Sequence, residues 1–256
     1  MCKRILIAAL SCALLFAMPT VASSQAQQLS PTETVRQFYK SMREKKYKEA
    51  FALSIYKPAI DGLSAKELEE LRPDFERMAA EIPDTMELSG ETISGELATV
   101  FVKVKGDGKT EPEEKLAPIP LMKANGIWII GDPQNQEIVK KGGSKYFFDA
   151  RINAHHDDVQ DMLNRITLAQ LYYSQGHNGL FGNMAELIGV GAVPKDLETS
   201  ASTGYIFHIT RSADGKTWWA SAEPALYGRS GKLSFYLDAA GVRSGDVGGK
   251  PLVIKN

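Results

Sequence analysis

The amino-acid sequence predicts an α+β protein of two small domains, each with helices packed on an antiparallel sheet. Three observations lead to this prediction. Apolar residues recur at helical spacing up to Pro83 and alternate at strand spacing after it. The order of a helix followed by strands returns after residue 147. A polar stretch with two glycines at 134–146 separates the two parts and is predicted to be a linker.

The composition is that of an ordinary globular protein. The 256 residues are 43% hydrophobic and 24% charged, with 22 Gly and 12 Pro. These values exclude collagen, a long coiled coil and wholesale disorder. There are 30 Lys and Arg residues against 31 Asp and Glu residues, a net charge of -1. We expect no nucleic-acid partner, because nucleic-acid phosphates favour a clearly basic surface.

Residues 1–26 have the parts of a bacterial signal peptide. Lys3 and Arg4 give a positive start, residues 5–18 are apolar, and small residues follow Pro19. The apolar stretch is shorter than the roughly 20 residues of a membrane-spanning helix. We therefore expect export to the periplasm or the exterior. Lipoprotein processing at Cys12 and an uncleaved anchor are the alternatives.

Cleavage of this signal would remove both cysteines of the chain, Cys2 and Cys12. The mature protein would then have no thiol nucleophile, disulfide or thiolate metal ligand. The signal contains two of the basic residues and no acidic one, so the net charge would become -3. No later stretch is long and apolar enough to span a membrane, so the mature chain is expected to have no transmembrane anchor.

Capping signals place helices in the first part. Residues 30–33, Ser-Pro-Thr-Glu, form a capping box with proline at the first helical position. A second, short helix is expected from Tyr47 to near Pro58. Another capping box at 64–67 begins a helix that Pro73 is expected to split or kink. The apolar stripe of the first helix consists of Val35, Phe38, Tyr39 and Met42.

Strands follow, with turn signals between them. Alternating hydrophobicity predicts strands at 86–93, 97–104, 116–123 and 127–130. The turn signals are Ser94-Gly95, Asp107-Gly108 and Asn125-Gly126, and Asn-Gly is the sharpest of them. The first domain is therefore predicted to end in an antiparallel sheet of about four strands.

The first part resembles a known family. Residues 30–53 begin Ser-Pro-Thr-Glu-Thr-Val-Arg-Gln-Phe-Tyr and, with Asn-Gly-Ile-Trp-Ile-Ile at 125–130, are similar to exported nuclear transport factor two-like (cystatin-like) domains. The resemblance covers residues 30–133. It implies a curved sheet wrapped around a long helix in the shape of a cone. It implies fold more than activity, because such cones host enzymes, ligand binders and assembly modules.

The second part, residues 147–256, is predicted to hold one long helix and a sheet. The helix should run from near Asp149 to Gln175, and 185–190 adds a short helical turn. The long helix has an apolar stripe of Ile152, Val159, Leu163, Ile166, Gln170 and Tyr173. The predicted strands are 204–211, 217–223 and 233–237, with a fourth after Gly241.

This second part resembles the soluble head of type IV pilins and pseudopilins. The resemblance rests on 150–173, on Met-Ala-Glu-Leu-Ile-Gly-Val-Gly-Ala-Val-Pro at 184–194, on 204–207 and on 232–242. It implies a helix packed on an antiparallel sheet. The processed Gly-Phe motif and the long apolar helix of a pilin do not occur, so filament assembly by the pilin route does not carry over.

No catalytic or cofactor motif is recognised. A Gly-x-Ser-x-Gly elbow does not occur, and Gly-Lys-Thr at 108–110 and 215–217 has no glycine five residues upstream, where a phosphate loop requires one. The best metal candidate is His155-His156-Asp157-Asp158, but adjacent helical residues diverge by about 100°. We therefore expect no cofactor, metal or catalytic set.

Aromatic residues are the candidate binding residues. In the first part they either line the cone or fill it: Tyr39, Tyr56, Phe101 and Trp128. Trp218 and Trp219 are neighbours on a predicted strand, so one ring should face the core and the other the outer face, unless a helix or loop covers both. An outward Trp marks a partner site.

These observations predict a non-enzymatic binding or envelope-associated assembly module. Its partner would be another protein or a second copy, with a small-molecule ligand as a further option. The alternative is a carrier or enzyme that uses the cone of the first part. Residues 146–148, Tyr-Phe-Phe, are expected to dock one part on the other.

Overall fold

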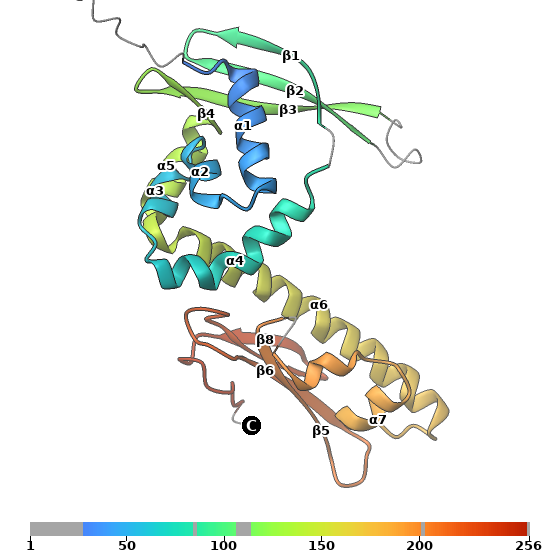
Figure 1. The fold of residues 1–256 in the computed structure, drawn as a ribbon. Helices are drawn as coiled ribbons and strands as arrows, with labels where there is room; N and C mark the ends of the chain where they lie inside the picture. Colours follow the sequence, from blue (N-terminus) through green and yellow to red (C-terminus); the bar gives the residue numbers. More distant parts are fainter. Residues whose placement is uncertain (1–27, 84–85, 106–113, 201–202, 255–256) are drawn as a thin grey trace, which may run out of the picture.

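The computed structural model describes residues 28–83, 86–105, 114–200 and 203–254. The chain forms helices and two separate four-stranded antiparallel sheets, in the orders β1-β2-β3-β4 and β5-β6-β7-β8 (Figure 1). The predicted α+β fold of two parts is confirmed. The predicted signal peptide and the Asp107-Gly108 turn lie outside the described residues.

The helices and strands follow one another in two helix-then-strand series. The helices are α1 (Pro31–Arg43), α2 (Tyr47–Ala52), α3 (Lys57–Asp61), α4 (Ala65–Ala80), α5 (Pro133–Gly142), α6 (Tyr146–Gly176) and α7 (Met184–Gly189). The strands are β1 (Glu87–Ser94), β2 (Leu97–Lys105), β3 (Glu114–Ala124), β4 (Ile127–Ile130), β5 (Tyr205–Arg211), β6 (Trp218–Pro224), β7 (Ser234–Asp238) and β8 (Gly241–Gly245). The predicted strands occur with ends shifted by no more than two residues.

The helix starts of the first half follow their capping signals. The Ser30 hydroxyl accepts a hydrogen bond from the Glu33 amide at 3.1 Å, and Ser64 and Glu67 form a reciprocal capping box at the start of α4. The expected end of a helix near Pro58 is wrong, because Pro58 lies in the first turn of α3. A proline is tolerated there since its missing N–H would have no partner inside the helix.

Pro73 does not divide α4. The helix runs unbroken through the proline, with Leu71 and Phe75 both buried on either side of it. Burial of these two side chains in one core offsets the hydrogen bond that proline cannot donate.

The first sheet packs against α1. Val35 on α1 forms one buried cluster with Val100, Leu121 and Trp128 of the sheet. Asn125 and Gly126 have φ values of 51° and 81°, the left-handed conformation of a tight hairpin turn between β3 and β4. The remaining helices of the first half bury a second cluster around Phe51 and Phe75.

The segment predicted as a linker is helical. Asp132 caps α5 by accepting a hydrogen bond from the Asn135 amide at 2.9 Å, and Pro133 takes the first helical position. Val139 of α5 is buried in the core of the first half. The polar composition of 134–146 describes the exposed side of this helix, so the linker prediction is wrong.

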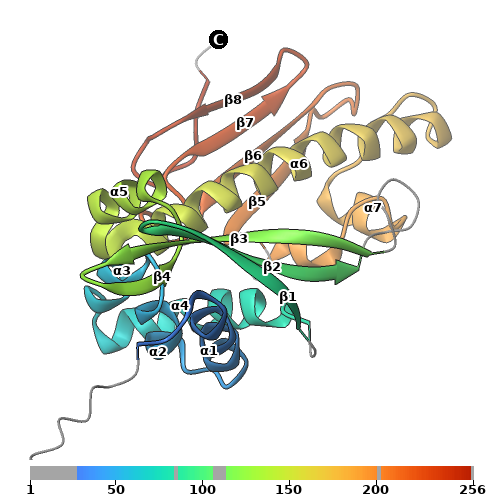
Figure 2. The same ribbon diagram turned by 90° about the horizontal axis from the view of Figure 1, so that it is seen from above.

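Helix α6 joins the two halves. Its first turn belongs to the core of the first half, where the Phe147 ring lies 5.2 Å from Phe51 and 5.1 Å from Phe75, centroid to centroid. Its later turns pack on the second sheet, as Figures 1 and 2 show. The boundary predicted at residue 147 therefore falls inside one continuous packing arrangement, and Phe147 anchors the second half to the first.

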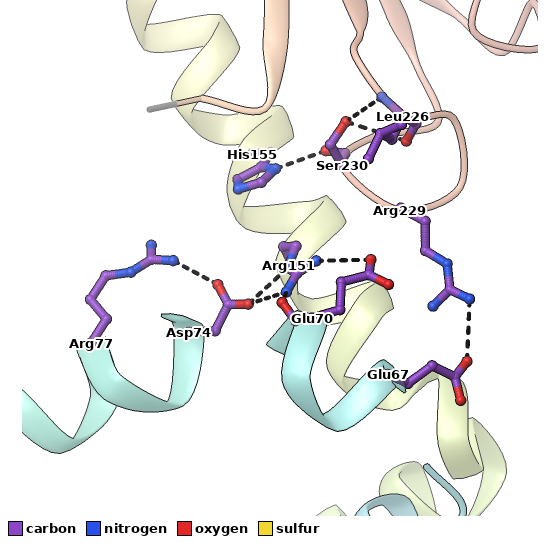
Figure 3. Close-up of polar contacts among 9 residues, drawn as sticks. All are labelled: Glu67, Glu70, Asp74, Arg77, Arg151, His155, Leu226, Arg229 and Ser230. Carbon is purple, nitrogen blue, oxygen red and sulfur yellow. Dashed lines mark hydrogen bonds and ion pairs between the residues drawn. The ribbon is translucent and has the colours of Figure 1, made fainter. Parts of the chain in front are cut away.

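Polar contacts reinforce this junction (Figure 3). The Arg151 guanidinium on α6 donates to the Asp74 carboxylate at 2.8 Å and to the Glu70 carbonyl at 2.7 Å on α4. Arg229, on the loop between β6 and β7, pairs with Glu67 at 3.2 Å and stacks on the Phe148 ring at 4.1 Å. Both halves are therefore fixed to α6 and to α4.

We expect Arg151→Ala to lower the free energy of unfolding by about 2–3 kcal/mol, because a half-buried carboxylate and a backbone carbonyl lose their donor. The Arg151 side chain is 12% exposed. Arg77→Ala is the matched control, since Arg77 also pairs with Asp74 but is 66% exposed. It should cost less than about 1 kcal/mol. Equal losses in urea unfolding would show that Arg151 does not hold the junction.

Candidate functional site

The hydrophobic core of the second half lies between α6 and the sheet β5-β6-β7-β8, and it sets the position of the helix above that sheet. The buried stripe of α6 is the predicted one, and it includes the polar Gln170, which is fully buried. It packs on Phe207 of β5, on Ala220 and Ala222 of β6, and on Leu237 of β7. The two alanines are small, so the helix lies close to the centre of the sheet.

The Gln170 side chain holds the segment that follows α6 through two hydrogen bonds to the Gly182 backbone. Its side-chain amide donates to the Gly182 carbonyl at 2.7 Å and accepts from the Gly182 amide at 2.8 Å. These two bonds satisfy every backbone polar group of Gly182 in the core. They hold Phe181 at the end of the sheet, where its amide donates to the Gly215 carbonyl at 2.9 Å.

An open groove of about 420 Å³ lies between α6 and the hairpin of β7 and β8. Its apolar wall consists of Leu171, Phe181, Trp218, Leu237 and Val242. Asn164, Thr167 and Asp238 supply polar groups to its lining. The Asp238 carboxylate is paired with Arg243. A groove of this kind accepts apolar side chains and offers few groups for chemistry.

Three large apolar side chains stand exposed beside this groove. Leu168, Leu171 and Tyr172 on α6 are 67%, 52% and 67% exposed. Their spacing of three and four places them on one side of the helix, away from the buried stripe. We call these three residues the α6 patch. Single exposed apolar residues need no explanation, but a contiguous patch that continues into a groove is typical of a protein-binding surface.

The two tryptophans face opposite sides of β6. Trp218 packs against the second core and lines the groove. Trp219 pairs across to Thr210 and alternates to the other face, since Ala220 and Ala222 define the core-facing side. The structure therefore brings Trp218, but not Trp219, to the candidate site. The binding role of either ring remains a prediction.

The four aromatic candidates of the first half are not brought together. Tyr39 and Trp128 pack in the cluster around Val35. Tyr56 lies in the other cluster, where burial and the neighbouring Tyr146 raise its pKa to about 12. Phe101 points to the opposite face of β2, because Val100 and its alternate neighbours are the buried ones. Of the two predictions for these rings, that they line the cone or fill it, Tyr39, Tyr56 and Trp128 match filling in that they pack in hydrophobic clusters.

The two histidines of the metal candidate bind the backbone at the junction. His155 Nδ1 lies 2.8 Å from the Ser230 carbonyl oxygen. His156 Nε2 accepts from the Lys232 and Leu233 amides at 3.2 and 3.3 Å, so its imidazole is neutral. Within the described ranges, no group of three or more His, Cys, Asp or Glu side chains is arranged to hold a metal ion.

Other concave surfaces also have apolar lining, and a groove of about 250 Å³ between α4 and α6 is lined by Leu71, Phe75, Met78 and Phe147 together with Asp74 and Arg151. A groove of about 440 Å³ on the other flank of α6 contains Asp158, Asp161 and Asp196 with Arg165. In the first half, an open groove of about 390 Å³ lies outside the β3–β4 hairpin, beside Ile55. In the part of the chain that the structure describes, none of the helices is both long and apolar enough to cross a membrane.

Comparisons with protein-family models, with curated proteins and with solved structures found no match. The resemblances to nuclear transport factor two-like domains and to pilin heads therefore remain predictions. The groove and the α6 patch are the surfaces of the second half that are suited to binding. Sequence reasoning identified Trp218 but missed Leu168, Leu171 and Tyr172, although their apolar spacing outside the buried stripe was a readable signal.

We expect Gln170→Leu to lower the free energy of unfolding by about 2–3 kcal/mol. Leucine has a similar volume, so the loss comes from leaving the Gly182 N–H and C=O buried without partners. Gln175→Leu is the control on the same helix, where the side chain is exposed, and it should change stability by less than about 0.5 kcal/mol. Urea unfolding monitored by circular dichroism measures both free energies of unfolding. Similar losses in the two variants would show that the hydrogen bonds from Gln170 to Gly182 do not stabilise the fold.

Stability should also depend on His156 below neutral pH. Burial lowers the pKa of His156, and the charges of His155 and Lys232 lower it further against the opposing effect of Asp157. As the pH falls, His156 therefore becomes protonated in the unfolded chain at a higher pH than in the folded protein. Stability is complete above about pH 6.5 and is lost as the pH falls through the lowered pKa.

The measurement is the urea midpoint of the wild type and of His156→Gln between about pH 7.5 and pH 5. The wild type should lose more stability on acidification than the variant, whose side chain cannot titrate. Parallel pH profiles would show that protonation of His156 does not affect the junction.

Proposed function

We propose that this protein is an exported bacterial binding or envelope-associated assembly module that acts without catalysis. It engages a protein partner through the groove of Leu171 and Trp218 together with the α6 patch. The observation that carries the proposal is the continuity of the two surfaces. Leu171 belongs to both, so a partner could cover the patch and place a side chain in the groove.

The chemistry of the surface supports binding rather than catalysis. The groove wall is aliphatic and aromatic, and such surfaces gain affinity by excluding water from apolar area. Tyrosine and tryptophan are among the residue types that contribute most to the binding energy of protein interfaces. Tyr172 belongs to the α6 patch and Trp218 lines the groove. Asp238, the acid in the lining, is occupied by Arg243.

The carrier or enzyme alternative has weaker support in the first half. Tyr39 and Trp128, which were predicted either to line the cone or to fill it, contribute to a buried cluster between α1 and the sheet. Their rings stabilise the fold in that position. The binding proposal therefore centres on the second half, and self-association is one form of it.

Site-specific photocrosslinking in the bacterium that encodes the chain tests the proposal. A benzophenone amino acid replaces Tyr172 in the full chain, and Ile138 on α5 is the control because it is also apolar and exposed. We expect a discrete protein adduct at position 172 and none at 138. The adduct should disappear when Leu168 and Leu171 are both changed to Gln.

The mass of the adduct identifies the partner. An increase by one further copy of the chain means self-association, and any other discrete mass means a different protein. Absence of an adduct at position 172, or an equal adduct at position 138, would contradict a binding role for this surface.

A further inference from the structure

An acidic surface adjoins the α6 patch on the same helix. Asp157 and Asp161 are exposed and lie four residues apart, in line with Leu168 and Tyr172 on the outward side of α6. Asp158 and Asp196 lie beside them at the groove of about 440 Å³, whose lining contains one cation, Arg165. We call these four aspartates the acidic surface.

The carboxylates of the acidic surface have no ion-pair partner among the described residues. This distinguishes them from the acidic groups of the junction, such as Asp74 and Asp149, which are paired with Arg151 and Lys232. Three of these carboxylates lie on α6 and the fourth, Asp196, lies on a later turn, and together with one guanidinium they give this surface a net negative charge. Close unpaired charges of one sign attract a partner of the opposite sign.

The acidic surface and the α6 patch form one continuous strip. From Asp157 to Tyr172 the helix rises about 22 Å, at about 1.5 Å per residue. In Figure 1 the start of α6 lies beside the first half and its end lies away from it. The acidic residues Asp157 and Asp161 are nearer the start of the helix, and the apolar residues Leu168 and Tyr172 are nearer its end. The two grooves flank it on either side, one beside Asp161 and the other beside Leu171.

We infer that the partner segment is a basic amphipathic helix that lies along α6. This inference rests on the proposed function and names the chemistry of the partner. Its apolar side chains, three and four residues apart, cover Leu168, Leu171 and Tyr172 and enter the groove at Trp218. Its lysines or arginines lie over Asp157 and Asp161. A helix fits because ridges of one helix pack into the grooves of another.

A second copy of the chain matches the acidic surface less well. In the turn between α1 and α2 of such a copy, Lys45 already pairs with Glu76 and Lys46 with Glu44. Binding through those lysines would break contacts that already exist. A separate basic segment loses nothing comparable when it binds.

The test compares two synthetic peptides of about 18 residues, which is about five helical turns. Both peptides have the same leucine face, and the polar face carries lysine in one and glutamate in the other. Fluorescence anisotropy measures their binding to the full exported chain at about 0.05 M and about 0.5 M salt. We expect the lysine peptide to bind at least about tenfold more tightly at low salt and to lose this advantage at high salt.

Variants separate the two surfaces. Leu168→Gln with Leu171→Gln should weaken the lysine peptide about tenfold or more. Asp157→Lys with Asp161→Lys should reverse the preference, so that the glutamate peptide binds more tightly. Glu49→Lys with Glu96→Lys is the matched control, because it makes the same charge change at exposed acidic positions of the first half. The control should keep the preference for lysine.

Three results would overturn the inference: equal binding of the two peptides, no binding of either, or an equal loss in the Glu49 and Glu96 control. If a crosslinked partner is nevertheless obtained at position 172, the proposed function stands and only the basic helical partner is wrong. If no crosslinked partner forms but the preference for the lysine peptide depends on Asp157 and Asp161, the strip binds basic amphipathic helices as inferred. The proposed binding function in the cell is then wrong.

Discussion

The structure depends on one constraint: the 31 residues of α6 serve two hydrophobic cores at once. Phe147 and Phe148 are buried against the helices of the first half, while a stripe of later residues is buried against the second sheet: Val159, Leu163, Ile166, Ala169 and Tyr173. A continuous helix fixes the position of one core relative to the other, because its backbone hydrogen bonds resist bending between the two cores. Arg151 and Arg229 add polar contacts at the point where the helix passes from one core to the next.

The candidate site is a consequence of that arrangement. A helix packed on one sheet buries one side and leaves the other side exposed along its length. Near the junction the exposed side is acidic, with Asp157 and Asp161, and the loop after β6 contacts the helix there through His155 and His156. Farther along, the exposed side becomes apolar at Leu168 and Tyr172. The hairpin of β7 and β8 then forms the wall of the groove that lies opposite Leu171.

Local signals predicted most elements, and the errors share one cause. Ser30 and Ser64 begin helices as predicted, because a cap is decided by residues within four positions. Pro58 and 134–146 were misjudged, and Pro73 does not split its helix, because the outcome depends on burial against distant residues. Val139, for example, is the one residue of α5 that is buried, and a single apolar contact gives little periodicity to detect.

The sequence by itself determined the α+β class, the order of the strands and the buried stripe of α6, including Gln170, because hydrophobic period and capping are properties of neighbouring residues. Only the tertiary structure decided that Phe101 faces away from Trp128, that Trp218 rather than Trp219 lies in the groove, and that both cores share one helix. These outcomes depend on which surfaces meet across long stretches of chain. Many pairings bury similar apolar area, so the composition of a single segment cannot specify them.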